Sequence, residues 1–196
     1  MKTQSIKLIL VIFIILNSFA CKQRNRISNP SNSNDVKIYE TNITLKKIKV
    51  SDIEKIEKKN SGIKYTKPIN NYLSEDYFPD LDKYEFAQPI IYQRDTLNLN
   101  TEISYYFTKN DSIVRLIEYS WNTNGKNQKP FINDFYSLNN SFITNTMKYN
   151  SKEEHHNFDY DWRKSKNWET TNTNIYSFVL GLNNEGYTTR VIVRQK

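Results

Sequence analysis

Two pairs of short segments with alternating side chains constrain this chain more than any other feature. Residues 174–182 and 187–194 are rich in β-branched and aromatic side chains, and the residues between them, 183–186, are typical of a turn. The same pattern occurs earlier, at 101–108 and 113–121, on either side of another polar turn. Each pair predicts an antiparallel hairpin, so neighbouring strands should build a sheet.

Two further segments have the spacing of helices. Ser51 followed three residues later by Glu54 has the pattern of a capping box, and predicts a short helix through about Lys59 that ends at Gly62. Apolar residues recur every three or four positions over 131–149 and predict a longer helix. We expect both helices to pack on one face of the sheet.

The remaining segments are assigned from weaker patterns. Loose alternation predicts one or two strands over 36–50 and a strand over 158–168, and a further strand over 84–92 is interrupted by a proline. The stretches 63–83 and 150–157 lack a clear period and are expected to be loops, the first with one helical turn at most.

The expected fold class is therefore α+β, with an antiparallel sheet of six to eight strands, one long helix and one short helix. Residues 103–107 and 175–179, which lie 72 positions apart, carry similar side chains. This similarity suits a duplicated unit of one helix followed by three strands. The other interpretation is that two hairpins rich in Tyr and Phe align through their composition alone.

The first twenty-one residues indicate an export signal. Lysines precede nine unbroken apolar residues at 8–16, and the small residues Ser18 and Ala20 lie just before Cys21. Nine apolar residues are too few to span a membrane, which needs about 20. We expect residues 1–20 to be removed from the mature protein.

This segment resembles the signal of bacterial lipoproteins, in which the cysteine after the small residues is diacylated and becomes the mature N-terminus. The resemblance implies that Cys21, the single cysteine of the chain, anchors the protein to a membrane. The polar residues up to 35 then predict a flexible tether, so that 21–35 link the lipid to a single domain at 36–196. The alternative is a plain secretory signal cut after Ala20, which leaves a free thiol.

The distribution of charge points to a location and excludes one class of partner. The net charge of the chain is +7, but five basic residues and one acid lie before residue 36, so the domain carries only +3. We find no basic cluster of the kind that binds nucleic acid, and expect no nucleic-acid partner. The tether is basic rather than acidic, which favours an outer-membrane anchor that faces the periplasm.

The densest polar cluster contains both histidines of the chain. His155 and His156 follow two glutamates, and imidazole beside carboxylate suits a divalent metal. Adjacent residues on a strand point to opposite sides, however, and no helical ligand spacing is present. We therefore expect no metal and no other cofactor, and His155 and His156 remain the weak candidates for a metal site.

We assign no catalytic residue from the sequence. The chain has no nucleophile motif, and its four glycines are isolated, so no phosphate-binding loop is expected. A pair of carboxylates that hydrolyses a glycan can come from any part of a chain. For such a pair the candidates are Glu118 together with Asp159 or Asp161.

Aromatic side chains give the leading functional hypothesis. The chain has 14 Tyr, 10 Phe and 3 Trp, concentrated on the expected strands. Most should pack in the core, but neighbours such as Tyr105 and Tyr106 cannot all face one side of a sheet. Exposed Tyr and Trp suit a binding surface. The candidate surface consists of Tyr105, Tyr119, Trp121, Tyr160, Trp162 and Trp168.

Taken together, these patterns predict a membrane-tethered, non-enzymatic binding lipoprotein of the bacterial envelope. It would engage a protein partner through an aromatic sheet face, and an inhibitor or immunity protein would have the same features. The alternative is a carboxylate-dependent envelope hydrolase that acts on glycan or peptidoglycan.

Overall fold

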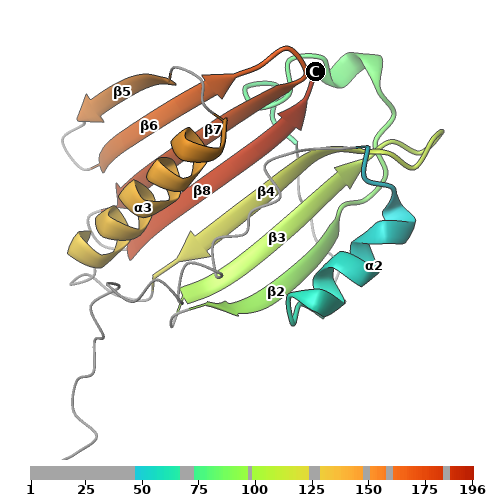
Figure 1. Ribbon diagram of the computed structural model, residues 1–196, viewed down its shortest axis with the longest axis horizontal. Coiled ribbons are helices and arrows are strands. Elements are labelled where there is room, and N and C mark those ends of the chain that lie inside the picture. The colour runs from blue at the N-terminus through green and yellow to red at the C-terminus, as the bar shows by residue number, and fades with distance from the viewer. Residues whose placement is uncertain are drawn as a thin grey trace, which may run out of the picture. The chain divides into compact units, whose positions relative to one another are not determined.

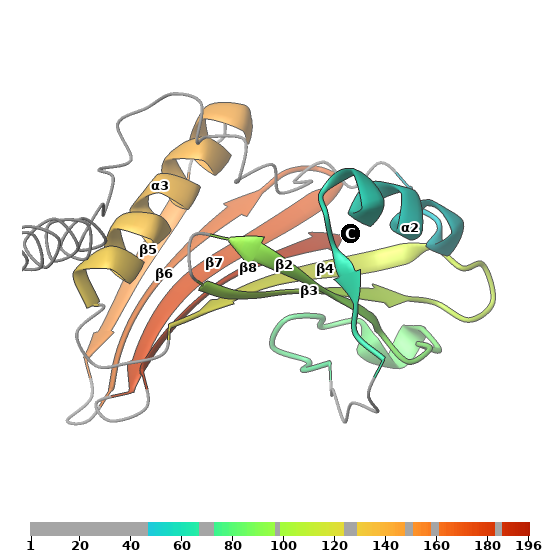
Figure 2. The same cartoon turned by 90° about the horizontal axis from the view of Figure 1, so that it is seen from below.

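The computed structural model describes residues 47–66, 73–96, 99–123, 129–147, 151–157, 161–182 and 186–196. In these residues one antiparallel sheet of eight strands carries two α-helices on one of its faces (Figures 1 and 2). The elements in chain order are α2 (Val50–Lys59), β1 (Ile63–Lys64), the 3-10 turn η2 (Leu81–Lys83), β2 (Ile90–Thr96), β3 (Leu99–Phe107), β4 (Val114–Asn122), α3 (Lys129–Met147), β5 (Ser151–Asn157), β6 (Asp161–Glu169), β7 (Thr173–Leu182) and β8 (Gly186–Gln195). The α+β prediction, with one long and one short helix, is confirmed.

The order of the strands reveals two similar units. The sheet runs β1-β2-β3-β4-β8-β7-β6-β5, and β4 pairs with β8 at its centre. On either side of that pair, a helix precedes four consecutive antiparallel strands, one more in each unit than the sequence predicts: α2 before β1–β4 and α3 before β5–β8. Ile103 on β3 and Ile175 on β7, 72 positions apart, are both fully buried. The sheet thus has the two-unit organisation that the 72-residue similarity predicts.

One face of the sheet, which we call the helix face, packs against α2 and α3. α2 lies over the β2–β3 side and α3 over the β6–β8 side (Figure 1). Under α3, the ring of Trp121 on β4 meets Phe135 at a centroid distance of 5.2 Å, edge to face. Trp168 on β6 donates its indole N–H to the Thr144 hydroxyl at 3.1 Å. Alternation along β4 and β6 therefore directs both of these tryptophans toward α3.

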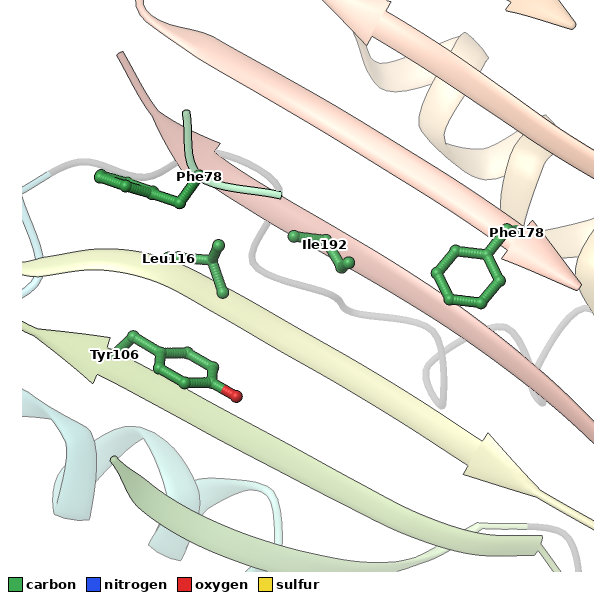
Figure 3. Close-up of a cluster of buried hydrophobic side chains, with 5 residues drawn as sticks. All are labelled: Phe78, Tyr106, Leu116, Phe178 and Ile192. Carbon is green, nitrogen blue, oxygen red and sulfur yellow. The ribbon is translucent and has the colours of Figure 1, made fainter. Parts of the chain in front are cut away.

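The other face of the sheet, which we call the opposite face, is covered in part by the segment that contains η2 (Figure 2). Phe78 of this segment packs with Tyr106, Leu116, Phe178 and Ile192 from β3, β4, β7 and β8 (Figure 3). All five side chains are at most 4% exposed. The segment expected to be a loop is thus part of the core, because its apolar side chains close a second hydrophobic layer.

A buried ion pair holds α2 against the sheet. The carboxylate of Glu57 is fully buried and accepts two hydrogen bonds from Arg94 on β2, at 2.6 and 2.9 Å. The Tyr105 hydroxyl donates to the same carboxylate. Gly62 lies so close that a Cβ atom there would be 2.2 Å from Glu57 Oε2. The glycine is needed for this contact between helix and loop, rather than for a backbone angle.

The ends of α2 differ from the sequence prediction. The helix begins at Val50, and the reciprocal cap is made by Lys49 and Asp52: the Lys49 N–H donates to the Asp52 carboxylate at 3.1 Å, and the Asp52 N–H donates to the Lys49 carbonyl at 2.9 Å. Ser51 is therefore inside the helix, and the predicted Ser51–Glu54 box was wrong. At the other end Ser61, with φ of 57°, supplies the left-handed residue that terminates many helices.

Three predictions about strands also need correction. Residues 151–157, expected to be a loop, form β5 at the edge of the sheet and pair along their length with β6. A polar edge strand has no buried face to impose alternation, so its sequence gives no strand signal. The strand expected over 84–92 begins only at Ile90, after Pro89. Of the strands expected over 36–50, only 47–50 belong to the described residues, where Lys49 makes an isolated bridge to Ile113 and Val50 starts α2.

No helix among the described residues is long and apolar enough to cross a membrane. Cys21 and the segments predicted to be the signal and tether lie outside the described residues.

Candidate functional site

Four of the six aromatic residues predicted to form a binding surface are in the core. Tyr105, Tyr119, Trp121 and Trp168 are between 0% and 2% exposed, and all four lie on the helix face. The prediction that they form an exposed surface is wrong, because their positions on the strands place them under α2 and α3. Tyr160 lies outside the described residues, and Trp162 is placed only by its backbone, which pairs with Gly181 on β7.

The candidate metal ligands do not gather in the described structure. His155 on β5 is exposed, and its ring nitrogen lies 3.3 Å from the Glu153 carboxylate. Across the strand pair, His155 is opposite Lys164 and His156 is opposite Arg163, so both neighbours are cationic residues. Among the described residues, no three His, Cys, Asp or Glu side chains are close enough together to hold a metal ion.

The candidate carboxylate Glu118 is engaged by its neighbours. Its side chain, only 16% exposed on β4, accepts hydrogen bonds from Arg190 at 2.9 Å and from the Tyr106 hydroxyl at 3.2 Å. Burial, helped by the charge of Glu118, raises the pKa of Tyr106, so this hydroxyl stays a donor at neutral pH. Asp161 lies on β6 opposite Leu182, and Asp159 lies outside the described residues. Strands β8 and β7 lie between β4 and β6, so the structure does not bring Glu118 together with Asp161.

The opposite face carries a group of arginines and aromatic rings that the sequence patterns did not single out. We call it the arginine–aromatic cluster: Tyr77 from the segment before η2, Arg163 from β6, Tyr176 and Phe178 from β7, and Arg190 from β8. The rings of Tyr77 and Phe178 stack at 6.1 Å with an interplanar angle of 10°, and Tyr176 lies 5.6 to 6.0 Å from both. Three strands and a distant segment therefore meet at one point of the sheet.

Both arginines of the cluster are held in place over aromatic rings. The Arg163 guanidinium lies 4.7 Å from the Phe178 centroid and 5.5 Å from that of Tyr176, and it donates to the Tyr176 hydroxyl. Arg190 lies 5.9 Å from the Phe178 ring while it bonds to Glu118. Cation–π contacts of this kind fix the planes of the guanidinium groups. Arg190 remains 39% exposed, and Arg163, Tyr77 and Tyr176 are half-buried.

The electrostatics of the cluster follow from this packing. Burial raises the pKa of Tyr77, and the nearby positive charges of Arg163 and Arg190 oppose that rise. Tyr77 therefore keeps its proton at neutral pH. The cluster presents tyrosine hydroxyls beside two guanidinium groups, of which that of Arg190 is paired with Glu118, and this arrangement suits a partner with carboxylates and hydrogen-bond acceptors.

A pocket adjoins the cluster, between the segment before η2 and strands β6, β7 and β8. Its volume is about 300 Å³. It is lined by Asp76, Tyr77, Asn167, Asn174, Tyr176 and Arg194, with Pro79 and Ile192 as apolar neighbours. Tyr77 and Tyr176 belong to both the pocket and the cluster, so the two features share one wall.

The sequence contains part of the signal for this site. Arg190 and Arg194 are separated by an even number of residues on a strongly predicted strand, which places them on one face. Arg163 joins them only because β6 and β8 both pair with β7 in the observed register, and Tyr77 only because its segment folds back over the sheet. No local sequence pattern predicts this strand register or the path of the segment that contains Tyr77.

Comparisons with known proteins add no further constraint. The chain matches no family model, and no curated protein and no solved structure is found to be similar to it.

Proposed function

We propose that this chain is a non-enzymatic binding protein of the bacterial envelope, tethered by a lipid on Cys21, which engages a protein partner through the arginine–aromatic cluster. The observation that carries the proposal is the stacking of two arginines on aromatic rings at a half-exposed point of the sheet. Arginine and tyrosine dominate the energetics of protein interfaces. Side chains that are already held in place lose little conformational entropy on binding.

The anchor rests on the sequence of the first twenty-one residues. A lipid on Cys21 and a tether of about fifteen residues would hold the domain at a membrane surface, in our proposal the outer membrane on its periplasmic side. An inhibitor or immunity protein that meets its target in the envelope would work in this way. The fold itself fits many functions, so the proposal depends on the cluster and the anchor.

The chemistry of the described pocket favours binding over hydrolysis. A glycan hydrolase of the paired-carboxylate type needs two acids on either side of the scissile bond. The pocket is lined by one carboxylate, Asp76, and by no tryptophan. Glu57 and Glu118 are each engaged by an arginine.

The anchor is tested by intact mass and fractionation of the full chain and its Cys21→Ser variant. We expect a diacyl mass on the native protein, found with membranes, and no added mass on the variant. A native protein without acyl chains would overturn the anchor and the location with it.

The cluster is tested by crosslinking in intact cells, with Arg163→Ala and Tyr176→Ala compared with Lys164→Ala. Lys164 is the neighbour of Arg163 on β6, and its side chain points to the helix face, so it is a matched control. We expect one crosslinked partner, lost by about tenfold or more in the two cluster variants and retained in the control. Equal loss or equal retention in all three variants would contradict the proposed surface.

A further inference from the structure

The pocket beside the cluster has two opposite charges in its lining. The guanidinium of Arg194 and the carboxylate of Asp76 both line it. Neither group forms a hydrogen bond or an ion pair with a described residue; Asp80 and Glu169 have their pKa lowered chiefly by a paired lysine and to a lesser degree by the charge of Arg194. Two opposite charges in one small pocket would each be satisfied by a ligand that carries both.

A buried acceptor in the same wall also lacks a partner. The side-chain oxygen of Asn167 on β6 is shielded from solvent and accepts no hydrogen bond. A buried acceptor without a donor is unfavourable, and because this oxygen is shielded from solvent, a ligand N–H reaches it only when the Asn167 amide turns toward the pocket. An ammonium group has three such hydrogens and a charge that complements Asp76.

The shape and the remaining lining limit the size of the ligand. A volume of about 300 Å³ is at the small end of ligand sites. The rings of Tyr77 and Tyr176, together with Ile192, offer an apolar surface for a short carbon skeleton. The amide of Asn174, next to Arg194 across the β7–β8 pair, provides a second donor for an anionic group.

We propose that this pocket binds a small zwitterion, an α-amino acid or a dipeptide, with its carboxylate on Arg194 and its ammonium group at Asn167 and Asp76. A ligand with only an anionic group would be attracted by Arg194 but repelled by Asp76, and one with only a cationic group would be attracted by Asp76 but repelled by Arg194, so a ligand with both groups is favoured over either. This site goes beyond the proposed function, because it concerns a small molecule and requires no protein partner.

The test uses the purified full chain and alanylalanine as the probe, with affinity measured by calorimetry and by ligand-observed NMR. Free alanine is measured beside it, together with N-acetyl-alanylalanine and alanylalanine amide, each of which lacks one charge. We expect alanylalanine or alanine to bind, and each capped form to bind about tenfold more weakly or worse. Equal binding of the capped and free dipeptides, or no binding of either zwitterion at millimolar concentration, would overturn the site.

Variants then locate the binding. Arg194→Gln should lower the affinity for alanylalanine about tenfold. Asp76 is exposed, so Asp76→Asn should lower that affinity only about threefold. Lys164→Gln, on the other side of the sheet, should bind as the native chain does, and thermal unfolding confirms that each variant is folded. If the Arg194→Gln variant binds alanylalanine as tightly as the native chain does, the proposal is wrong. Partner crosslinking is measured in cells, and Arg163, unlike Tyr176, does not line the pocket. Failure of the Arg163→Ala crosslinking experiment therefore leaves this one intact, and the reverse also holds.

Discussion

The two helix–four-strand units have the same architecture but hold their helices on the sheet by different interactions. The short helix α2 is held by a fully buried carboxylate, Glu57, which bonds to Arg94 and to the Tyr105 hydroxyl. The long helix α3 has no such pair among its described contacts. It buries Ile132, Phe135, Tyr136, Asn139, Asn140 and Ile143, and gains one hydrogen bond from Trp168 to Thr144.

Helix length explains this difference. α2 has ten residues and buries only Ile53 and Glu57, which leaves little apolar area to hold it on the sheet. α3 has nineteen residues and can rely on area alone. A buried ion pair adds little net stability, but it fixes the position of the helix on the sheet. In any other position a charged side chain would be buried without its partner. We infer that Glu57 sets where α2 lies, while the packing of large side chains sets the place of α3.

The largest effect is expected on breaking the anchor of α2. Glu57→Ala leaves Arg94, only 14% exposed, without its partner, and should lower the free energy of unfolding by about 3–5 kcal/mol. Urea denaturation of the full chain and of the variant measures this change in the free energy of unfolding. Glu54→Ala, on the exposed side of the same helix, is the control and should change stability by less than about 0.5 kcal/mol.

A triple variant sharpens the same prediction. Glu57→Leu combined with Arg94→Met and Tyr105→Phe replaces the pair and the hydroxyl that donates to it by apolar side chains, and should recover most of the lost stability. If Glu57→Ala is within about 1 kcal/mol of the native chain, α2 does not depend on this pair and the contrast between the two units fails.

Alkaline pH is expected to weaken both units through buried tyrosines. Burial raises the pKa of Tyr105 and Tyr106 above the ordinary value of 10.0, and that of Tyr136 on α3 to about 12. Above pH 10 the unfolded chain loses these protons while the folded chain keeps them. Stability is therefore complete below pH 10 and falls as pH rises, by up to about 1.4 kcal/mol per pH unit for each tyrosine.

Urea denaturation at pH 9 and at pH 11 measures this loss of stability. Substitution of one tyrosine at a time shows how much of the loss each tyrosine causes. Tyr136→Phe cannot ionise, so the drop between the two pH values should shrink by about 1 kcal/mol. An unchanged drop in this variant would show that Tyr136 is not protected from ionisation by the packing of α3.

A smaller effect than that of Glu57→Ala is expected at the single hydrogen bond under α3. Thr144→Val keeps the shape of the side chain but leaves the indole N–H of the fully buried Trp168 without its acceptor, at a cost of about 1–2 kcal/mol. Thr146→Val, which removes an exposed hydroxyl two residues away, is the matched control and should be nearly neutral. A loss as large as that of Glu57→Ala would mean that α3 is also fastened by one polar contact.

The sequence alone determined the elements that have a strong period. The hairpin of β7 and β8, the hairpin of β3 and β4, and the long helix were all predicted close to their observed bounds. Alternation and helical spacing are local properties, since each residue's environment repeats along its own segment. β5 was missed for the same reason: with no buried face, its polar residues become a strand only by pairing with β6.

Tertiary structure decided which aromatic residues are buried and where the arginines meet. Tyr105, Tyr119, Trp121 and Trp168 were expected to be exposed because the sequence shows only that adjacent side chains point apart, not which side the helices cover. Arg163 and Arg190, 27 positions apart, lie over one ring because β6 and β8 both pair with β7. Strand register and the path of the segment before η2 arise from long-range packing, and they alone bring this site together.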